Sequence, residues 1–342
     1  MQATLKILVI QFKSLGDAVL MVPALKAVRD HFPDSQLHVL VSEQAAPLLQ
    51  NLPWINRVWI MPRIRGRARV KQNWPIIRAL RAERFDRSVD FAGNDRGAVL
   101  SLLCGARERL GLDIPGFFGK RFCFTRCIAP VPADQHAAWR NFHVLSVWQI
   151  VPPSILEITI NSAPALAGFA KTQLPEKKII CHMGAGMPKK QWPVRHWAAF
   201  YQQASAAGFK LAFTAGENQR EKTLAADLKK IIPSAQILPP FSIAEFLAVL
   251  SRAQALVTGD TGPMHFAAAL GVPLVALFGA TSLVLWKPIT KNCRILTGAP
   301  CTCAAASHDC HSASHCMDSI APDQVLAALQ KMFPSTSSTF QA

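Results

Sequence analysis

The sequence has no apolar run approaching the ~18 residues that indicate a membrane span, although half of its 342 residues are hydrophobic. Its first apolar run, residues 5–10, is short and has no signal-peptide pattern around it. We therefore expect a cytoplasmic protein without a membrane-spanning helix. The chain is long enough for two domains of common size, and its apolar residues can supply a core for each.

Acidic residues are scarce. The chain has 21 Asp and Glu against 37 Lys and Arg, which gives a formal net charge of +16 at pH 7. Such an excess favours an anionic partner, namely nucleic acid, an acidic membrane face or a phosphorylated substrate. The sequence contains no helix-turn-helix, zinc-finger or RNA-binding signature, so we expect no nucleic-acid partner. Charge alone does not choose between the other two classes.

Paired C-x-x-C motifs are also missing. Four of the nine cysteines, Cys301, Cys303, Cys310 and Cys316, lie in a loop that also holds three histidines. Their spacing is irregular for a zinc ribbon, so we expect no metal site. The cysteines of a cytosolic chain are mostly reduced, and the spacing leaves the state of this cluster open.

Strand and helix patterns alternate along the chain, which predicts an α/β fold with parallel sheets covered on both faces. Proline and small residues interrupt the alternation around residues 151–175. We predict domains at residues 1–155 and 156–334, followed by a disordered tail at 335–342. The predicted strands are residues 5–11, 36–41, 58–61, 88–91, 108–111, 178–182, 210–214, 255–258 and 274–278.

The G-x-G-x-x-G fingerprint of dinucleotide binding follows the first strand of neither half. The stretch of residues 256–279 instead reads as strand, tight loop, helix and strand, with Pro263 suited to the first helical turn. A helix that begins just past the carboxyl end of a parallel strand can bind a phosphate through its free N–H groups. An ordinary turn with Asp260 as the helix cap is an equal alternative.

Three other loops hold charged residues where strands end. Asp17 can cap its helix, which is the simpler interpretation, or accept a proton from a hydroxyl. Lys189 and Lys190 suit a diphosphate, whereas the alternative is a solvated basic loop. Glu217 can bind the hydroxyls of a ribose or only favour the start of its own helix.

Together these motifs resemble glycosyltransferase family 9, the ADP-heptose:lipopolysaccharide heptosyltransferases. The order and spacing match from about residue 5 to residue 333, and the segment from Asp260 to Gly271 is the most specific part. The matching motifs are Gly16-Asp17, residues 23–25, 190–193, 216–217, 260–265, 267–271 and 278–281. Ala280 departs from the proline that the family often has at this position.

The resemblance implies a GT-B architecture, with two Rossmann-like doubly wound domains facing a cleft. The first domain binds the acceptor and the second binds the nucleotide sugar. The implied reaction is an inverting, metal-independent transfer of heptose from ADP-L-glycero-D-manno-heptose to the inner core of lipopolysaccharide, without a cofactor. A member that uses another nucleotide sugar, or a sugar-nucleotide epimerase of the same fold, is the alternative.

The resemblance also implies roles for single residues. Asp17 is the expected general base and Lys190 the residue that steadies the diphosphate, although the adjacent Lys189 is not distinguished from it. The expected donor-binding set is Gly184, Lys189, Glu217, Phe241, Asp260, Thr261, Gly262 and His265.

A basic run places a cation at every second position, at Arg63, Arg65, Arg67, Arg69 and Lys71. On an extended segment all five side chains share one face. A solvated loop is the alternative, but the acceptor of the resembled family is an acidic lipid A–Kdo/heptose core at the inner-membrane face. We therefore expect these residues to bind the acceptor and to hold the protein peripherally on the cytoplasmic face of the inner membrane.

Overall fold

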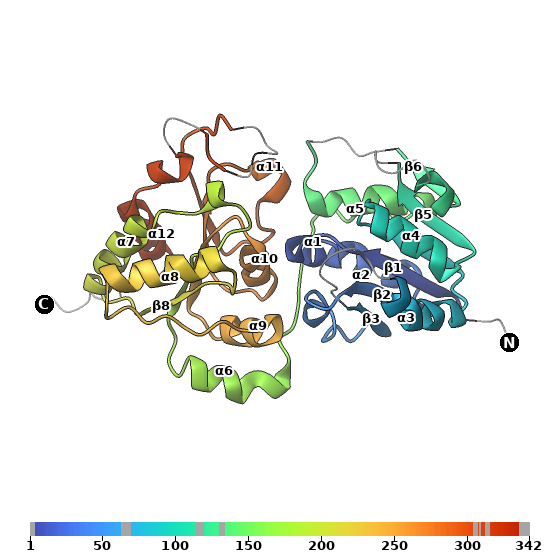
Figure 1. Cartoon of the computed structure of the whole chain (residues 1–342), viewed down its shortest axis with the longest axis horizontal. Coiled ribbons are helices and arrows are strands. Elements are labelled where there is room, and N and C mark those ends of the chain that lie inside the picture. Colours follow the sequence, from blue (N-terminus) through green and yellow to red (C-terminus); the bar gives the residue numbers. More distant parts are fainter. Residues whose placement is uncertain are drawn as a thin grey trace, which may run out of the picture. The chain divides into compact units, whose positions relative to one another are not determined.

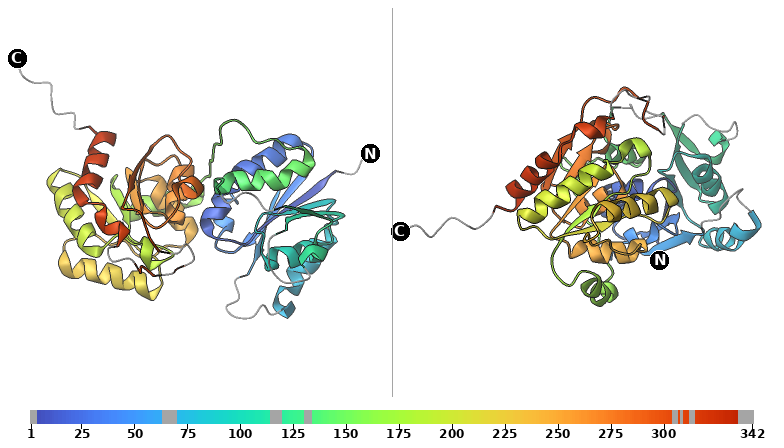
Figure 2. Two further views of the ribbon diagram at one scale, coloured as in Figure 1. Left: turned by 90° about the horizontal axis from the view of Figure 1, so that it is seen from above. Right: turned by 60° about the vertical axis from the view of Figure 1, so that its left-hand side comes forward.

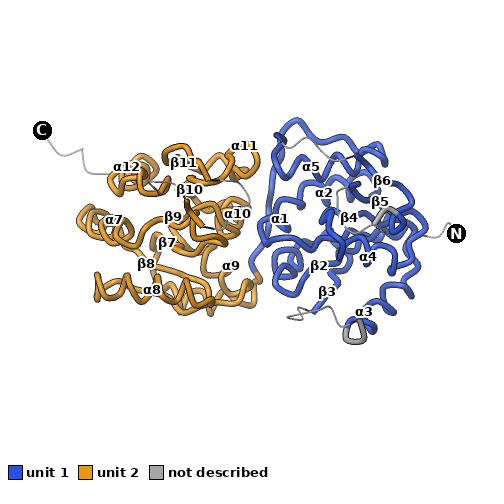
Figure 3. Tube along the Cα trace, turned by 45° about the horizontal axis from the view of Figure 1, so that its top comes forward, with its two compact units in different colours: residues 1–162 blue, residues 163–342 orange. Residues whose placement is uncertain are grey.

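The computed structural model describes residues 4–62, 70–113, 120–129, 134–303, 307, 309–311 and 315–334. The chain divides into two compact units, residues 1–162 and 163–342, shown in blue and orange in Figure 3. The division falls after residue 162 and not after residue 155, because the intervening segment packs on unit 1. Ile158 and Ile160 are buried there, and the side-chain amides of Asn51 and Asn161 donate to each other's backbone carbonyls. The predicted tail lies outside the described residues.

Unit 1 contains one parallel sheet of six strands in the order β3-β2-β1-β4-β5-β6. Its central strands are buried on both faces, and residues 7–10 of β1 are fully inaccessible to solvent. This burial explains their continuous apolar pattern. The strands are β1 (Lys6–Gln11), β2 (Gln36–Ser42), β3 (Arg57–Met61), β4 (Arg87–Asp90), β5 (Glu108–Leu112) and β6 (Arg126–Ile128).

Helices cover both faces of this sheet (Figures 1 and 2). Residues of α3 and α4 share a core with β1, β2 and β3, whereas α1, α2 and α5 pack against one another. The helices of unit 1 are α1 (Leu15–Leu20), α2 (Val22–His31), α3 (Val70–Ala82), α4 (Asp95–Cys104) and α5 (Ala137–Leu145), with short 3-10 turns at Ala46–Leu48, Lys120–Cys123 and Ser146–Trp148.

Unit 2 contains a parallel sheet of five strands in the order β11-β10-β9-β7-β8. The strands are β7 (Ile179–His182), β8 (Leu211–Thr214), β9 (Ala255–Gly259), β10 (Leu274–Phe278) and β11 (Cys293–Thr297). Its helices are α6 (Ala167–Gln173), α7 (Val194–Ala206), α8 (Gln219–Ile231), α9 (Ile243–Ser251), α10 (Gly262–Ala269), α11 (Leu283–Trp286) and α12 (Pro322–Met332), with 3-10 turns at Pro164–Leu166, Pro188–Lys190 and Cys316–Ser319.

One face of the second sheet packs against α7, α8 and α12 through a large apolar core that includes Trp192 and Trp197. The helix α9 contacts both α6 and α10. The predicted α/β fold, with a doubly wound parallel sheet in each half, is confirmed. None of the helices in the described ranges combines the length and the apolar character that crossing a membrane requires.

Each sheet has one point at which the strand order reverses, here called its switch point. In unit 1 it lies between β1 and β4, and in unit 2 between β7 and β9. Helices leave such neighbouring strands toward opposite faces, so the backbone opens a crevice at their carboxyl ends where ligands of α/β proteins bind. The predicted site residues Asp17, Lys190 and Asp260 all follow one of these four strands.

Candidate functional site

The switch point of unit 2 is spanned by an ion pair. Lys190 follows β7, Asp260 follows β9, and the Lys190 ammonium lies 2.8 Å from Oδ2 of Asp260. Only 7% of the Asp260 side chain is exposed, compared with 21% for Lys190. A buried carboxylate needs such a partner, because desolvation penalises the isolated charge. The structure therefore brings together two residues that lie 70 positions apart in the sequence.

Asp260 does not act as the cap of α10. The N-cap residue is Thr261, which makes no side-chain capping bond, and Pro263 occupies the first turn. The Thr261 hydroxyl lies 3.2 Å from that of Thr258 instead. At this helix start Pro263 has no N–H and the Met264 amide donates to the Thr261 carbonyl, so the Gly262 N–H is the group of the first turn that suits a phosphate.

Close backbone approach explains one glycine in this site. A Cβ atom on Gly259 would lie 3.1 Å from the carbonyl oxygen of Lys190. A larger residue at the end of β9 would therefore require the Lys190 backbone to shift by a few tenths of an ångström. His265, four percent exposed, lies inside the unit on α10.

Burial distinguishes the two adjacent lysines. Lys189 is 1% exposed, so its side chain is directed into the unit, whereas the Lys190 ammonium is partly open to solvent beside Asp260. Only Lys190 has the access that a diphosphate ligand requires. The alternative of a solvated basic loop is wrong for Lys189.

Glu217, the predicted ribose-binding residue, is exposed and precedes α8. A different carboxylate, Glu221, is buried beside the same loop with 7% exposure. It accepts hydrogen bonds from the Gly216 amide and, at 2.8 Å, from the Asn218 side chain. A Cβ atom on Gly184 would collide with Glu221. Gly184 thus makes room for the carboxylate that fixes the loop between β8 and α8.

Sequence reasoning missed Glu221, although one signal pointed to it. Asn218 caps α8 by accepting from the Glu221 amide at 3.0 Å. Asn-x-x-Glu is the spacing at which a cap residue and a first-turn carboxylate meet. Only the position of Gly184, on a loop more than thirty residues earlier, shows that this carboxylate is enclosed.

His182 ends β7 beside this carboxylate. Its Nδ1 lies 3.0 Å from the Thr214 hydroxyl. Burial lowers the pKa of His182 from 6.5 to about 4, and the negative charge of Glu221 opposes part of that shift. The imidazole is therefore neutral at pH 7. Phe241, the remaining predicted donor residue, lies before α9 and packs edge to face on Phe169 at 5.9 Å between ring centroids.

The switch point of unit 1 carries Asp17 in the first turn of α1. Its Oδ2 accepts hydrogen bonds from the Ser14 amide at 3.1 Å and the Ser14 hydroxyl at 2.6 Å. Ser14 and Asp17 thus form a capping box. Within the described residues, every hydrogen bond recorded for this carboxylate uses Oδ2, so the capping role leaves Oδ1 for another partner.

The predicted acceptor residues are mostly outside the described ranges. Arg63, Arg65, Arg67 and Arg69 fall between residues 62 and 70, where nothing is described. Lys71 belongs to α3, which begins at Val70. The assignment of Lys71 and of the four arginines to acceptor binding stays a prediction.

In the cysteine cluster, the sulfurs of Cys303 and Cys310 lie 3.8 Å apart, too far for the bond of a disulfide. Burial raises the pKa of the Cys316 thiol to about 11, and the neighbouring Cys301 adds to the shift. Across the described ranges, no three His, Cys, Asp or Glu side chains converge in a way that suits a metal ion. The expectation of no metal stays a prediction.

Three comparisons connect this geometry with known proteins. A family model for glycosyltransferase family 9 (heptosyltransferase) matches residues 74–315. Lipopolysaccharide heptosyltransferase 3 of Escherichia coli is 24% identical over 294 residues, which cover 81% of this chain and 84% of that protein.

Solved structures share the fold over nearly the whole chain. The ADP-heptose lipopolysaccharide heptosyltransferase II of Escherichia coli matches with a TM-score of 0.77 and 20% identity, covering 96% of this chain and 98% of that chain. Escherichia coli heptosyltransferase WaaC with ADP matches with a TM-score of 0.72 and 20% identity, covering 96% and 100%.

Proposed function

The chain belongs to glycosyltransferase family 9, the heptosyltransferase family, and has the GT-B fold; from this premise we propose that it moves heptose from ADP-L-glycero-D-manno-heptose to the inner core of lipopolysaccharide. The enzyme is a glycosyltransferase of lipopolysaccharide biosynthesis. The donor, the stereochemical course and the metal independence are parts of the proposal.

The observation that carries the proposal is the Lys190–Asp260 pair beside the uncapped start of α10. A departing diphosphate gains negative charge as its bond to the sugar breaks. A partly exposed ammonium and a free helix N–H group are the donors that stabilise such charge. Asp260 keeps that ammonium in place, and the ADP in the WaaC structure is consistent with a nucleoside diphosphate in this fold.

We assign proton acceptance to Asp17. The acceptor hydroxyl gives its proton to this carboxylate while its oxygen attacks the anomeric carbon of the sugar. The bond from that carbon to the diphosphate oxygen breaks, and the electron pair leaves with ADP. Attack opposite the leaving group inverts the anomeric centre. Ser14 orients the carboxylate through Oδ2, which leaves Oδ1 as the proton acceptor.

We assign phosphate binding to Lys190, Thr261, Gly262 and His265, with Lys189 and Gly184 supporting the loop. Glu217 and Phe241 are proposed to contact the nucleoside. The acceptor is proposed to be the acidic lipid A–Kdo/heptose core, bound in part by Arg63, Arg65, Arg67, Arg69 and Lys71, at the cytoplasmic face of the inner membrane. No nucleic acid, cofactor or metal takes part in this proposal.

The decisive experiment is incubation of the protein with ADP-heptose and truncated lipopolysaccharide cores, read by mass spectrometry. We expect a mass increase of one heptose on one core length, with inversion of the anomeric configuration by NMR and full activity in EDTA. Turnover with another nucleotide sugar only would favour the alternative family member. Sugar-nucleotide conversion without an acceptor would favour an epimerase. Loss of activity in EDTA, restored by a metal, would contradict metal independence.

Membrane association has its own test. We expect the protein to sediment with vesicles that contain anionic lipids and to be released by salt, because screening weakens contacts between exposed charges. Equal partition with neutral vesicles would contradict docking by the basic run.

A further inference from the structure

Arg96 occupies the switch point of unit 1. It is the second residue of α4, which follows the carboxyl end of β4. The neighbouring strand β1 leads into the loop that carries Asp17. Arg96 and Asp17 therefore flank the place where α/β sheets of this strand order bind their ligands.

The Arg96 side chain is held against that loop. Its guanidinium carbon lies 4.5 Å from the centroid of the Phe12 ring, and Phe12 directly follows β1. Asn94 caps α4 by accepting from the Gly97 amide at 2.9 Å and donates to the Phe12 carbonyl at 3.3 Å. Stacking on a ring uses the face of a guanidinium, so its in-plane N–H groups stay free to donate.

The charge of Arg96 is not balanced. It forms no ion pair within the described part of the chain. Although the residue is exposed, partial burial of its side chain lowers its pKa, with no carboxylate acting in the other direction. A cation in the first helical turn also meets the positive end of the helix dipole. The protein alone thus does little to stabilise the positive charge of this side chain.

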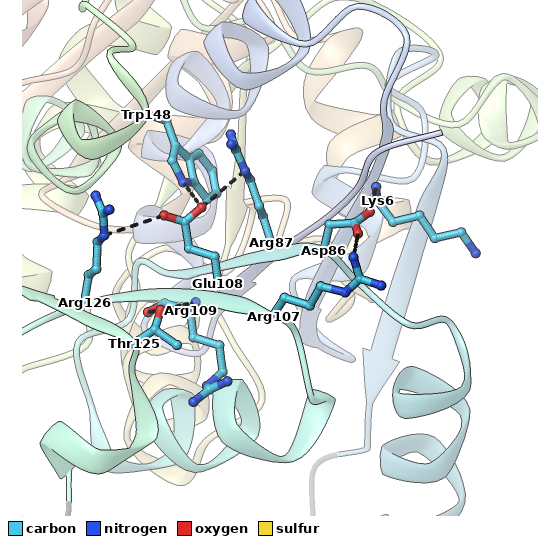
Figure 4. Close-up of polar contacts among 9 residues, drawn as sticks. All are labelled: Lys6, Asp86, Arg87, Arg107, Glu108, Arg109, Thr125, Arg126 and Trp148. Atoms are coloured by element: carbon cyan, nitrogen blue, oxygen red, sulfur yellow. Dashed lines mark hydrogen bonds and ion pairs between the residues drawn. The ribbon is translucent and has the colours of Figure 1, made fainter. Parts of the chain in front are cut away.

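Arginines at the amino ends of the strands in the same sheet have different partners (Figure 4). Arg87 begins β4 and also stacks on aromatic rings, 5.0 Å from Phe32 and 5.5 Å from Trp148. Its Nε lies 3.2 Å from Glu108, which also accepts from the Trp148 indole at 3.1 Å. Arg87 at the start of β4 and Arg96 on the helix after β4 both lie over aromatic rings, and of the two only Arg87 pairs with a carboxylate.

We propose that Arg96 binds an oxyanion of the acceptor, a phosphate or a carboxylate on the saccharide, and thereby places the acceptor hydroxyl beside Asp17. The proposal rests on the function proposed above. A guanidinium fork fits both oxyanions in a bidentate manner. Lys13, exposed between Phe12 and Asp17 and without an ion pair in the described ranges, contributes a second cation to the same edge. Arg96 is a specificity-determining residue in this scheme.

The test compares Arg96→Ala and Arg96→Lys with the matched control Arg57→Ala. Arg57 is also an exposed arginine over a ring, 3.7 Å from the Trp59 centroid, but it lies at the amino edge and pairs with Glu83. We expect Arg96→Ala to raise the acceptor KM about tenfold to a hundredfold, as loss of a charged hydrogen-bond partner does. We expect kcat and the donor KM to be unchanged, with Arg96→Lys intermediate.

A purely structural role predicts a different result. It would lower the melting temperature of Arg96→Ala and leave the acceptor KM equal to that of Arg57→Ala. That outcome overturns the proposal.

Altered acceptors identify the oxyanion. If removal of the acceptor phosphates abolishes the difference between wild type and Arg96→Ala, the ligand is a phosphate. If reduction of the sugar carboxyl groups abolishes it, the ligand is a carboxylate. A difference that persists when both groups are removed overturns the proposal.

Failure of the proposed function is distinguishable from failure of this inference. A wild-type protein that transfers no sugar contradicts the proposed function. Calorimetric binding of the acidic core saccharide then decides the role of Arg96, and we expect the same tenfold or greater loss in Arg96→Ala. Equal affinities, or no binding by the wild type, overturn the inference.

Discussion

Both units place a cation and a carboxylate beside the switch point of their sheet, but they arrange these charges differently. In unit 2, Lys190 and Asp260 meet at 2.8 Å. In unit 1, Asp17 is held by Ser14 and Arg96 lies over Phe12. The charges of an ion pair compensate each other before a ligand binds, so both side chains have defined positions. A carboxylate and a cation that are not paired with each other can still bind a proton and an anion.

This difference fits the division of labour proposed for the two units. The positive charge of the protein that stabilises a leaving diphosphate must already be in position, since reorganisation of the site during the reaction would raise the barrier. A general base must instead keep an oxygen that no other donor occupies. Substitutions in one unit should therefore affect one of these two functions and leave the other unchanged.

Removal of the Asp17 carboxylate should have the largest effect. We expect Asp17→Ala to lower kcat by about 10²- to 10⁴-fold, the contribution of a general base, with unchanged affinity for the ADP-sugar by calorimetry. Ser14→Ala is the matched control, because it removes the 2.6 Å hydroxyl contact and keeps the carboxylate. Full transfer by Asp17→Ala would exclude this residue as the base.

Separation of the buried pair in unit 2 should have the next largest effect. We expect Asp260→Asn to weaken donor binding and to lower the free energy of unfolding by about 1–3 kcal/mol, because it leaves Lys190 without its carboxylate. Calorimetry and urea unfolding measure the two quantities.

The control for this variant is Asp227→Asn. Asp227 pairs with Lys230 at the same 2.8 Å, but both side chains are exposed on α8. Exposed pairs contribute about 0–1 kcal/mol, so donor affinity and stability should change little. Equal losses in the two variants would show that burial of the Lys190–Asp260 pair has no special role.

Acid should destabilise the protein through two neutral histidines, one in each unit. Burial is the main cause that lowers the pKa of both His38 and His182 from 6.5 to about 4. The unfolded chain therefore binds protons more tightly than the folded one below pH ~6.5. Their stabilisation is complete above that pH and is lost as the pH falls toward about 4. Each histidine contributes at most about 3 kcal/mol of stability at neutral pH.

Urea unfolding at pH 7 and pH 4.5 measures this loss. We expect His182→Gln and His38→Gln each to reduce the pH dependence. Only His182→Gln should also reduce the acid sensitivity of donor binding, because His182 lies beside Glu221 in unit 2. A pH dependence that neither substitution reduces would contradict the assignment.

Loss of a helix cap should have the smallest effect. Asn94 caps α4 in unit 1 and Asn218 caps α8 in unit 2. We expect Asn94→Ala and Asn218→Ala each to lower the free energy of unfolding by about 1 kcal/mol. The first should raise only the acceptor KM and the second only the donor KM. The opposite pattern would contradict the assignment of acceptor to unit 1 and donor to unit 2.

Nine strands of the two sheets were expected from their short apolar runs, and all nine occur, including the edge strands β3 and β8. The strands β6 and β11 were missed. Both are edge strands whose residues are exposed or only partly buried, so their sequences lack the continuous apolar pattern from which the others are recognised.

The residues of the candidate site could be predicted where they belong to short motifs of neighbouring residues. Gly259-Asp260-Thr261-Gly262 stands out at the end of a strand, and Lys189-Lys190 in the glycine-bearing loop that follows one. Glu221 and Arg96 were not predicted, because the first depends on space beside Gly184 and the second on the ring of Phe12. Gly184 and Phe12 are both too far away in the sequence for a local pattern to indicate these contacts.

By itself, the sequence determined the α/β class, the family and the loops that carry charge, since these depend on hydrophobic periodicity and on motifs within a few residues. Tertiary structure alone decided the roles within those loops. In the folded protein Asp260 pairs with Lys190 and does not cap a helix. Lys189 is buried, whereas Lys190 is partly exposed. The physical reason is that desolvation and ion pairing depend on distances between strands 70 or more residues apart, which only the assembled sheet establishes.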